Sequence, residues 1–439
     1  MTRNVKLLKW GYGAGYLVLL ASLYLFTYFV FIKHREPAVT EICFADRITA
    51  AHKILIDRYN RMNEGRIKVI PIDFPNRDFS TNERKEILAR SLRGEGDGID
   101  LLAVDLIWVQ RFAKWCEPLG GYFSEKELKR IIPDALYSCY SDDGLMAVPL
   151  DMVQSVLYYR DDLLRGCKDG EEVAQELRHT MTWPEFLKLK DRLNWRGPFY
   201  VFPAADYEGL ICSYIEVLLS LKQDYFSTVG FNFNTPEGRQ SMQLLVDLVQ
   251  KYGAAPDIVT SFTEVPSYEY FVKNDGLFIK GWTSYDKDFK NQPYDRDKEQ
   301  HLRKVPIPRL PGGKSASMFG GWNLMISKYS AKKEAVVNFV KFLLQDDSQE
   351  AFYAEGGYYP VVSSFYEDPA SLQKYPEISE IKRLMQTGVH RPPQEDYTNY
   401  SKIMSYYFVQ AIKKKITVAE ATESATRAIQ SAKTLVVAR

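Results

Sequence analysis

The sequence has few of the residues that build metal and redox sites. Its 439 residues include only five cysteines and five histidines. No two cysteines are spaced as C-x-x-C and no histidines are spaced as metal ligands, which argues against zinc sites and thioredoxin-like chemistry. We therefore predict no metal and no cofactor. Because the number of cysteines is odd, at least one thiol lies outside any internal disulfide; we expect mostly buried free thiols, with a Cys116–Cys139 pair as the alternative.

The chain also lacks an excess of charge of either sign. Its 57 basic and 56 acidic residues give a formal net charge of +1. A surface without a general positive field has little attraction for a polyanion, so we do not expect nucleic acid as a partner.

Sequence signatures of common enzymes are missing as well. The chain has no nucleophile elbow, no P-loop, no H-E-x-x-H and no dinucleotide fingerprint. Asp105 and Asp151 could form the carboxylate pair of a glycoside hydrolase, and this is the one enzymatic alternative that the residues leave open. We predict that the protein is not an enzyme.

Internal repeats and low-complexity tracts are absent, and only one segment is a long apolar run. Residues 11–32 carry no charge, and an apolar run of about 20 residues spans a bilayer as a helix. Arg3, Lys6 and Lys9 precede the run, which favours a cytoplasmic N-terminus. We predict a single-pass anchor over residues 1–36 with the body outside the cytoplasm; cleavage near Pro37 is the alternative.

Behind the anchor, strand and helix patterns alternate. Strands are predicted over Val39–Phe44, Ile67–Ile72 and Leu101–Val104, with amphipathic helices over Ile48–Met62 and Glu86–Leu92 between them. This order indicates a parallel sheet covered by helices, in which ligands bind beyond the carboxyl ends of the strands.

Further along, helix patterns dominate. Thr182 has the position of a helix N-cap, with Pro184 in the first turn that follows. Amphipathic helices are predicted over Ala331–Leu344 and Ile403–Lys414, and the Pro- and Gly-containing stretch Val305–Gly313 is predicted to be a loop.

Eight segments in order along the body resemble one known family, the bacterial extracellular solute-binding proteins, family 1. These are the sugar-binding proteins of ABC importers and are related to maltose- and trehalose-binding proteins. Each segment is a weak match, but together they cover essentially everything after the anchor. The segments are Asp100–Leu119, Met146–Asp151, Leu157–Leu163, Met181–Leu189, Gly276–Trp282, Gly320–Phe342, Glu355–Pro360 and His390–Ser401.

The resemblance implies an α/β, two-lobed periplasmic-binding-protein fold of type II, here preceded by one transmembrane helix. Each lobe is expected to hold a mostly parallel sheet flanked by helices. Lobe 1 is expected over residues 37–150 and 324–370, and lobe 2 over residues 151–323 and 371–439. The chain should cross between lobes near Pro149–Asp151, near Trp322–Leu324 and after about Phe365. We see no sequence reason for oligomers and expect a monomer.

The resemblance also implies a sugar site between the lobes. A sugar needs aromatic planes for its C–H faces and charged groups for its hydroxyls. The family positions suggest Trp282 and Trp322 for stacking, and Asp105, Asp151 and Arg391 for hydroxyl binding. Further candidates are walls at Tyr207, Tyr358 and Tyr359, close backbone approach at Gly320 and Gly321, and polar groups at Asp46 and Arg47.

Each candidate has a structural alternative. The tryptophans could be core residues, Asp105 could cap a helix that begins near Leu106, and Asp151 could be a turn residue at the hinge.

The chain also departs from the family. Lys280–Gly281–Trp282 stands where Gly–Pro–Trp is usual, the first loop lacks the usual aromatic segment, and the plain anchor replaces a cleaved or lipidated signal.

We therefore expect the substrate-binding component of a carbohydrate ABC importer, held at the cell membrane with its body in the periplasm or extracellular space. Its partners would be the permease subunits and a sugar, and disaccharides of the trehalose or maltose type are the favoured ligands. The alternative is a membrane-tethered sensor that reports ligand to a signalling partner.

Overall fold

The computed structural model describes residues 16, 19–26, 39–75, 81–288 and 296–437. The predicted membrane span over residues 11–32 lies mostly outside these residues. In the part of the chain that the structure describes, no helix combines the length and the apolar character that crossing a membrane requires.

The described residues build one sheet of nine strands. Seven follow one another across it in the order β2-β1-β3-β10-β6-β8-β7, while β11 pairs with β10 and β9 pairs with β6. A small hairpin of β4 (Tyr140–Ser141) and β5 (Gly144–Leu145) lies apart. The strands of the main sheet are β1 Thr40–Asp46, β2 Ile67–Asp73, β3 Leu101–Asp105, β6 Val148–Arg160, β7 Tyr200–Val201, β8 Phe278–Trp282, β9 Leu302–Val305, β10 Ser317–Ile326 and β11 Gly388–Val389.

The alternation predicted for the start of the body is confirmed. The chain runs β1, α2 (Ala50–Met62), β2, α3 (Thr81–Arg93), β3, and β1 pairs in parallel with both β2 and β3. In α2, Ala51, Leu55 and Tyr59 recur at helical spacing and are buried, which explains why this segment packs on the sheet as a helix. The helix predicted from Glu86 begins earlier, at Thr81.

The expectation of mostly parallel sheets is wrong for the middle of the sheet. Strand β10 runs antiparallel to both β3 and β6, and β6 runs antiparallel to β8 and β9. The two long strands β6 and β10 traverse the molecule in opposite directions, and only the short strand β11 pairs in parallel with one of them, β10. The sheet is therefore mixed, with parallel pairs toward its two edges.

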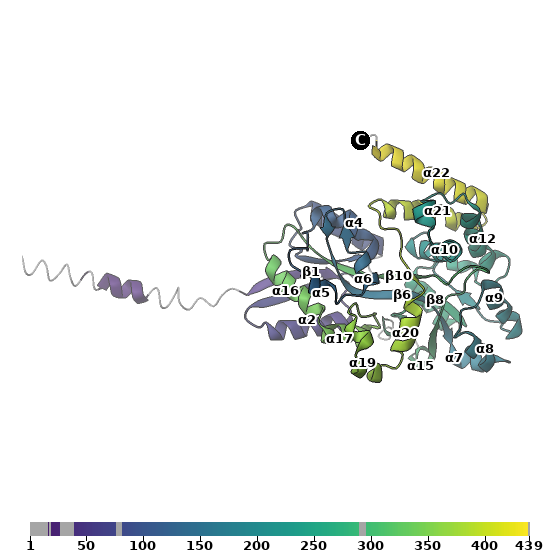
Figure 1. Ribbon diagram of the computed structural model, residues 1–439, viewed down its shortest axis with the longest axis horizontal. Helices are drawn as coiled ribbons and strands as arrows, with labels where there is room; N and C mark the ends of the chain where they lie inside the picture. The colour runs from purple at the N-terminus through teal and green to yellow at the C-terminus, as the bar shows by residue number, and fades with distance from the viewer. Residues whose placement is uncertain (1–15, 17–18, 27–38, 76–80, 289–295, 438–439) are drawn as a thin grey trace, which may run out of the picture.

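Helices gather at the two ends of these long strands (Figure 1). A first helix group of α2, α16 (Lys333–Leu343) and α17 (Asp346–Gly356) packs beside β1. A second helix group of α10 (Glu208–Leu221), α12 (Pro236–Gln250), α21 (Tyr397–Ile412) and α22 (Val418–Val437) packs at the other end. Strands β6 and β10 pass from one group to the other, and both are buried along almost their whole length.

The remaining helices surround these two groups. Helix α9 begins after Thr182, whose side chain accepts a hydrogen bond from the Glu185 N–H, as predicted. The bounds of these helices are α4 Val109–Phe112, α5 Glu125–Leu128, α6 Pro133–Tyr137, α7 Asp161–Arg165, α8 Gly170–Glu176, α9 Trp183–Arg192, α11 Tyr225–Thr228, α13 Glu264–Lys273, α14 Tyr285–Asp288, α15 Arg296–Glu299, α18 Ser364–Glu367, α19 Pro369–Lys374 and α20 Ile378–Met385.

All five cysteines lie among the described residues and are free thiols. The alternative Cys116–Cys139 disulfide is therefore not formed. Burial raises the pKa of the thiols of Cys116, Cys139 and Cys212, which keeps them protonated and unreactive near neutral pH.

Candidate binding site

Three of the predicted site residues lie in one row across the centre of the sheet. Trp322 on β10 is directly opposite Asp105 on β3 and directly opposite Asp151 on β6. Residues that face each other in an antiparallel pair project from the same face of the sheet, with Cβ atoms about 5 Å apart. We call Asp105, Trp322 and Asp151 the central row. Residues that are far apart in the sequence thus meet where the two long strands pair.

Trp282 lies next to the central row. It ends β8, where it is opposite Ser155 of β6. Its ring rests against Gly320, because a Cβ atom at Gly320 would lie only 3.0 Å from the Trp282 ring. Gly320 and Trp322 are two residues apart on β10, so their side-chain directions share one face of the sheet. Trp282 and Trp322 therefore share a face, and both are partly exposed.

Gly321 has a structural role that the sequence did not indicate. Its φ angle of +134° is rarely adopted by other residues, and a Cβ atom there would lie 2.4 Å from the carbonyl oxygen of Asp151. The pairing of β10 with β6 shifts in register immediately after Trp322. Gly321 thus allows β6 and β10 to approach closely where Trp322 and Asp151 of the central row pair. The predicted contact of Gly321 with ligand stays a prediction.

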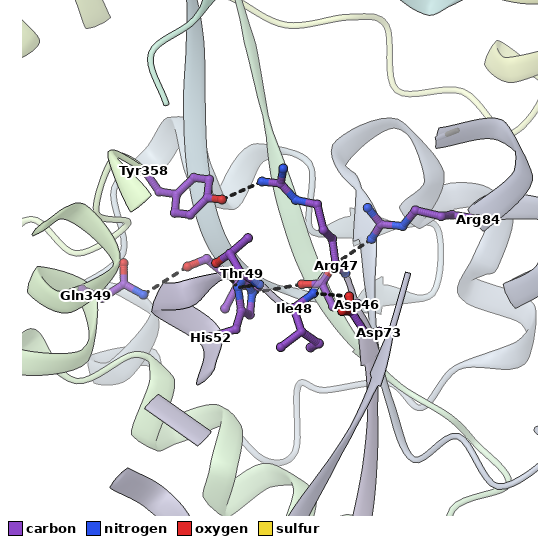
Figure 2. A network of polar contacts seen from close by, with 10 residues as sticks. Asp46, Arg47, Ile48, Thr49, His52, Asp73, Arg84, Gln349 and Tyr358 are labelled. Carbon is purple, nitrogen blue, oxygen red and sulfur yellow. Dashed lines mark hydrogen bonds and ion pairs between the residues drawn. The ribbon is translucent and has the colours of Figure 1, made fainter. Parts of the chain in front are cut away.

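Asp46, at the end of β1, is the centre of a buried polar network (Figure 2). Its carboxylate lies 2.7 Å from Nη2 of Arg84 and 3.1 Å from Nε2 of His52, and it accepts a hydrogen bond from the Arg47 backbone N–H. Burial alone would raise the pKa of Asp46, but the hydrogen bond with His52 and the charges of His52 and Arg84 outweigh burial and lower it. Asp46 therefore organises this end of the site as an anion.

The lowered pKa of Asp46 predicts a pH-dependent loss of stability. A carboxyl with a lowered folded-state pKa adds stability above its unfolded pKa and loses it as pH falls through the folded pKa. Asp46→Asn is expected to be less stable than wild type at pH 7, and this difference should shrink below about pH 4, near the 3.8 of an unperturbed Asp. Urea unfolding at several pH values measures it; a difference that stays constant down to pH 3 would contradict the assignment.

Tyr358 and Tyr359 are more deeply buried than wall residues of an open site would be. Their exposures are 3% and 2%. The hydroxyl of Tyr358 accepts a hydrogen bond of 2.7 Å from Arg47, which joins the loop after β1 to the segment that follows α17 (Figure 2). Tyr359 pairs with Met152 of β6 through backbone hydrogen bonds. Both tyrosines therefore pack the first helix group against the long strands.

Arg391 joins the two ends of the molecule. Its guanidinium lies 2.8 Å from Asp105, at the end of β3, and 3.2 Å from Glu208, at the start of α10 in the second helix group. Asp105 also accepts a hydrogen bond from the Ile107 N–H, so the helix-cap interpretation is correct, and its contact with ligand stays a prediction. Burial raises the pKa of Glu208, although Arg391 opposes this effect.

Tyr207 lies on the α10 side of the site. Its ring folds over Gly209, where a Cβ atom would lie 2.0 Å from the tyrosine oxygen. Burial, together with the negative charge of Glu264 on α13, raises the pKa of the Tyr207 hydroxyl well above its ordinary value. The phenol is therefore neutral and lies beside Glu264 of α13.

Three residues at the site were not among the predicted site residues. Arg84 stacks on the Trp322 ring with its Cζ 4.0 Å from the ring centroid. Trp108 meets the same ring edge-on, with centroids 5.8 Å apart. Glu208 holds Arg391 and accepts from Tyr397. Arg84 lies in a helix rich in charged residues, and neither periodicity nor a motif distinguishes it from its neighbours.

Two hollows flank the site. One is lined by Ile107, Tyr137, Phe319, His390 and Arg391, among others. The other lies beside Glu216 and Lys280. Neither is lined by Trp282 or Trp322. Arg84 covers part of the central row, because its guanidinium stacks on the Trp322 ring.

Comparisons with known proteins agree with this architecture. Residues 45–350 match the family model of the bacterial extracellular solute-binding proteins. A probable ABC transporter-binding protein of Deinococcus radiodurans is 23% identical over 333 residues, which cover 74% of this chain and 76% of that protein.

Solved structures give the same picture. The maltose-bound MalE3 of Thermotoga maritima has a TM-score of 0.78 and 25% identity, covering 89% of this chain and 99% of that one. A cyclic alpha-maltosyl-1,6-maltose binding protein of Arthrobacter globiformis has a TM-score of 0.69 and 20% identity, covering 90% and 99%. A Thermotoga lettingae solute-binding protein with bound tagatose has a TM-score of 0.75 and 20% identity, covering 90% and 99%.

The mixed sheet with two long antiparallel strands and helices at both ends, together with the likeness to MalE3, defines a protein of the periplasmic-binding-protein class. The chain belongs to the bacterial extracellular solute-binding protein family, whose members serve ABC importers as substrate-binding components. It is thus an extracytoplasmic transport component and not an enzyme, as predicted.

Proposed function

We propose that this protein binds a sugar between its two helix groups and delivers it to an ABC permease by hinge closure. The observation that carries the proposal is the central row beside Trp282. Two partly exposed indoles and two carboxylates share one face of the sheet where the long strands pair. Indole planes suit the C–H faces of a sugar ring, and carboxylates suit its hydroxyls.

The relatives support a sugar rather than another solute. The structures similar to this one carry maltose, a cyclic maltosyl-maltose and tagatose in their names. Those ligands are neutral carbohydrates that range from a monosaccharide to a cyclic oligosaccharide. We propose a mono- or disaccharide here, with Trp322 and Trp282 as stacking residues and Asp105, the more exposed carboxylate of the central row, as a hydroxyl acceptor; Asp151 is 1% exposed.

The position of Arg391 supports closure as the mechanism. Arg391 reaches Asp105 on β3 and Glu208 on α10, so its ion pairs join the two ends of the molecule. A ligand bound between the helix groups can contact both of them only when the protein is closed. Ligand binding therefore favours the closed state. We expect the radius of gyration from small-angle scattering to fall on addition of saturating sugar. Identical profiles with and without a bound sugar would contradict closure.

We further propose that residues 1–36 anchor the protein in the membrane. Full-length protein should resist extraction from membranes by sodium carbonate, whereas a chain beginning at Ala38 should be released. Release of both proteins would contradict the anchor.

The sensor alternative is tested by purifying the anchored protein from its own membranes. Co-purification with permease subunits supports transport, whereas co-purification with a signalling protein in their place contradicts it.

A further inference from the structure

One face of the Trp322 ring is already occupied. The Arg84 guanidinium carbon lies 4.0 Å from the ring centroid, a distance at which a cation attracts the face of an indole. Trp108 lies nearly perpendicular to the ring, at an interplanar angle of 79°, so it does not stack on it. Trp322 itself remains partly exposed, whereas Arg84 is only 1% exposed.

Arg84 is held in this position from its other side. Its Nη2 atom lies 2.7 Å from Asp46, and the side chains of both residues are 3% exposed or less. His52 lies on the far oxygen of Asp46 and is itself held by Thr49 (Figure 2). Moving Arg84 away would leave a buried carboxylate without its closest cationic partner, which is unfavourable. The stack on Trp322 is therefore a built feature of the site.

We propose that Arg84 determines ligand length by occupying one face of Trp322, so that the site accepts a mono- or disaccharide and excludes longer chains. The inference rests on the proposed function, because it assumes that Trp322 binds sugar. An indole whose two faces are open can carry a sugar ring on each side. Here the guanidinium takes the place of one ring, and only the opposite face of Trp322 is left for the ligand.

The charge of Arg84 does not by itself indicate an anionic ligand. Asp46 compensates it at 2.7 Å, and Asp105 adds a further negative charge nearby. Arg84 restricts the ligand by its shape, because its planar guanidinium occupies a face of the indole on which a sugar ring could otherwise stack. Substitutions that change this shape should therefore alter the preference for ligand length more than the preference among sugars of one length.

The test is isothermal titration calorimetry of the full-length protein with matched di- and trisaccharides: maltose and maltotriose, cellobiose and cellotriose, xylobiose and xylotriose. Wild type is expected to prefer the disaccharide of the series that it binds by about tenfold or more. In the double variant Asp46→Asn with Arg84→Met, which leaves no charged carboxylate behind, this preference should fall by about tenfold.

Two further variants complete the test. Arg84→Lys keeps the positive charge but loses the planar stack, and it should also reduce the preference for the disaccharide. Because it retains the ion pair, it serves if the double variant fails to fold. Arg93→Met, at an exposed position on the same helix, should leave the preference unchanged.

The outcomes separate the two claims. An unchanged ratio of disaccharide to trisaccharide affinity in every folded Arg84 variant overturns the role of Arg84 alone. Failure of wild type to bind any saccharide overturns this role and the proposed function together.

Discussion

Replacing Lys280 with methionine is expected to lower the free energy of unfolding by about 3–5 kcal/mol, the usual cost of breaking a buried ion pair from one side. Nζ of Lys280 lies 2.9 Å from Oε2 of Glu216, and the two side chains are 6% and 3% exposed. Glu216 also accepts hydrogen bonds from the Ser155 hydroxyl and the Met318 N–H. The variant would leave the buried Glu216 carboxylate, in the second helix group, without the ammonium group that balances its charge.

Urea unfolding of matched variants measures the effect. Glu216→Gln added to Lys280→Met removes the second charge but keeps an acceptor for Met318, so it should recover much of the lost stability. Lys129→Met is the surface control, because Lys129 and Glu125 form an ion pair with side chains that are 73% and 85% exposed. It should shift the urea midpoint little. Equal shifts in Lys280→Met and Lys129→Met would contradict the role of the buried pair.

The Lys280 pair also gives a physical reason for a departure in the sequence. Lys280 stands where the family usually has a glycine, two residues before Trp282. The structure shows that Lys280 ties β8 to α10, and that Glu216 in turn ties α10 to the start of β10. The ion pair thus links the strand that ends in Trp282 to the strand that carries Trp322.

Trp322→Ala is expected to weaken sugar binding more than about tenfold, or about 1.4 kcal/mol. The indole is the aromatic member of the central row, between Asp105 and Asp151, and it is partly exposed. Its loss would remove the stacking plane and also the surface on which Arg84 rests. Calorimetric titration with the sugar that binds wild type measures the change.

A second tryptophan provides the control for this experiment. Trp195 is also partly buried, but it follows α9 and donates to the Pro198 carbonyl, away from the central row. Trp195→Ala should leave the affinity within about twofold of wild type. If Trp322→Ala binds as tightly as wild type, Trp322 is a core residue and the stacking role is wrong.

The sequence predicted those parts of the fold that depend on local pattern. Buried residues such as Leu55 and Tyr59 recur at helical spacing, so α2 was recognised, and the apolar run Leu101–Val104 marked β3. The antiparallel middle of the sheet was missed because strand direction depends on how β6 and β10 return across the molecule. No local pattern in residues 148–160 or 317–326 encodes that direction.

The residues of the central row were selected from the sequence, whereas the side-chain contacts around them were not predicted. Resemblance to the family singled out Asp105, Asp151 and Trp322, and the register of three strands brings them together. Arg84 and Glu208 were missed because their importance lies in long-range partners: Trp322 for Arg84, and Arg391 for Glu208. Charged residues in helices are usually solvated, so only the folded chain distinguishes these two.

The most direct test of sugar binding is a thermal-shift screen of the full-length protein in mild detergent against mono- and disaccharides, polyols and amino acids. A ligand that binds only the folded protein raises the unfolding midpoint further as its concentration increases relative to its dissociation constant. We predict a concentration-dependent rise with one or a few mono- or disaccharides, and no such rise in Trp322→Ala at the same concentrations. A rise with an amino acid and with no carbohydrate would contradict the sugar assignment, and no rise with any solute would contradict ligand binding by this site.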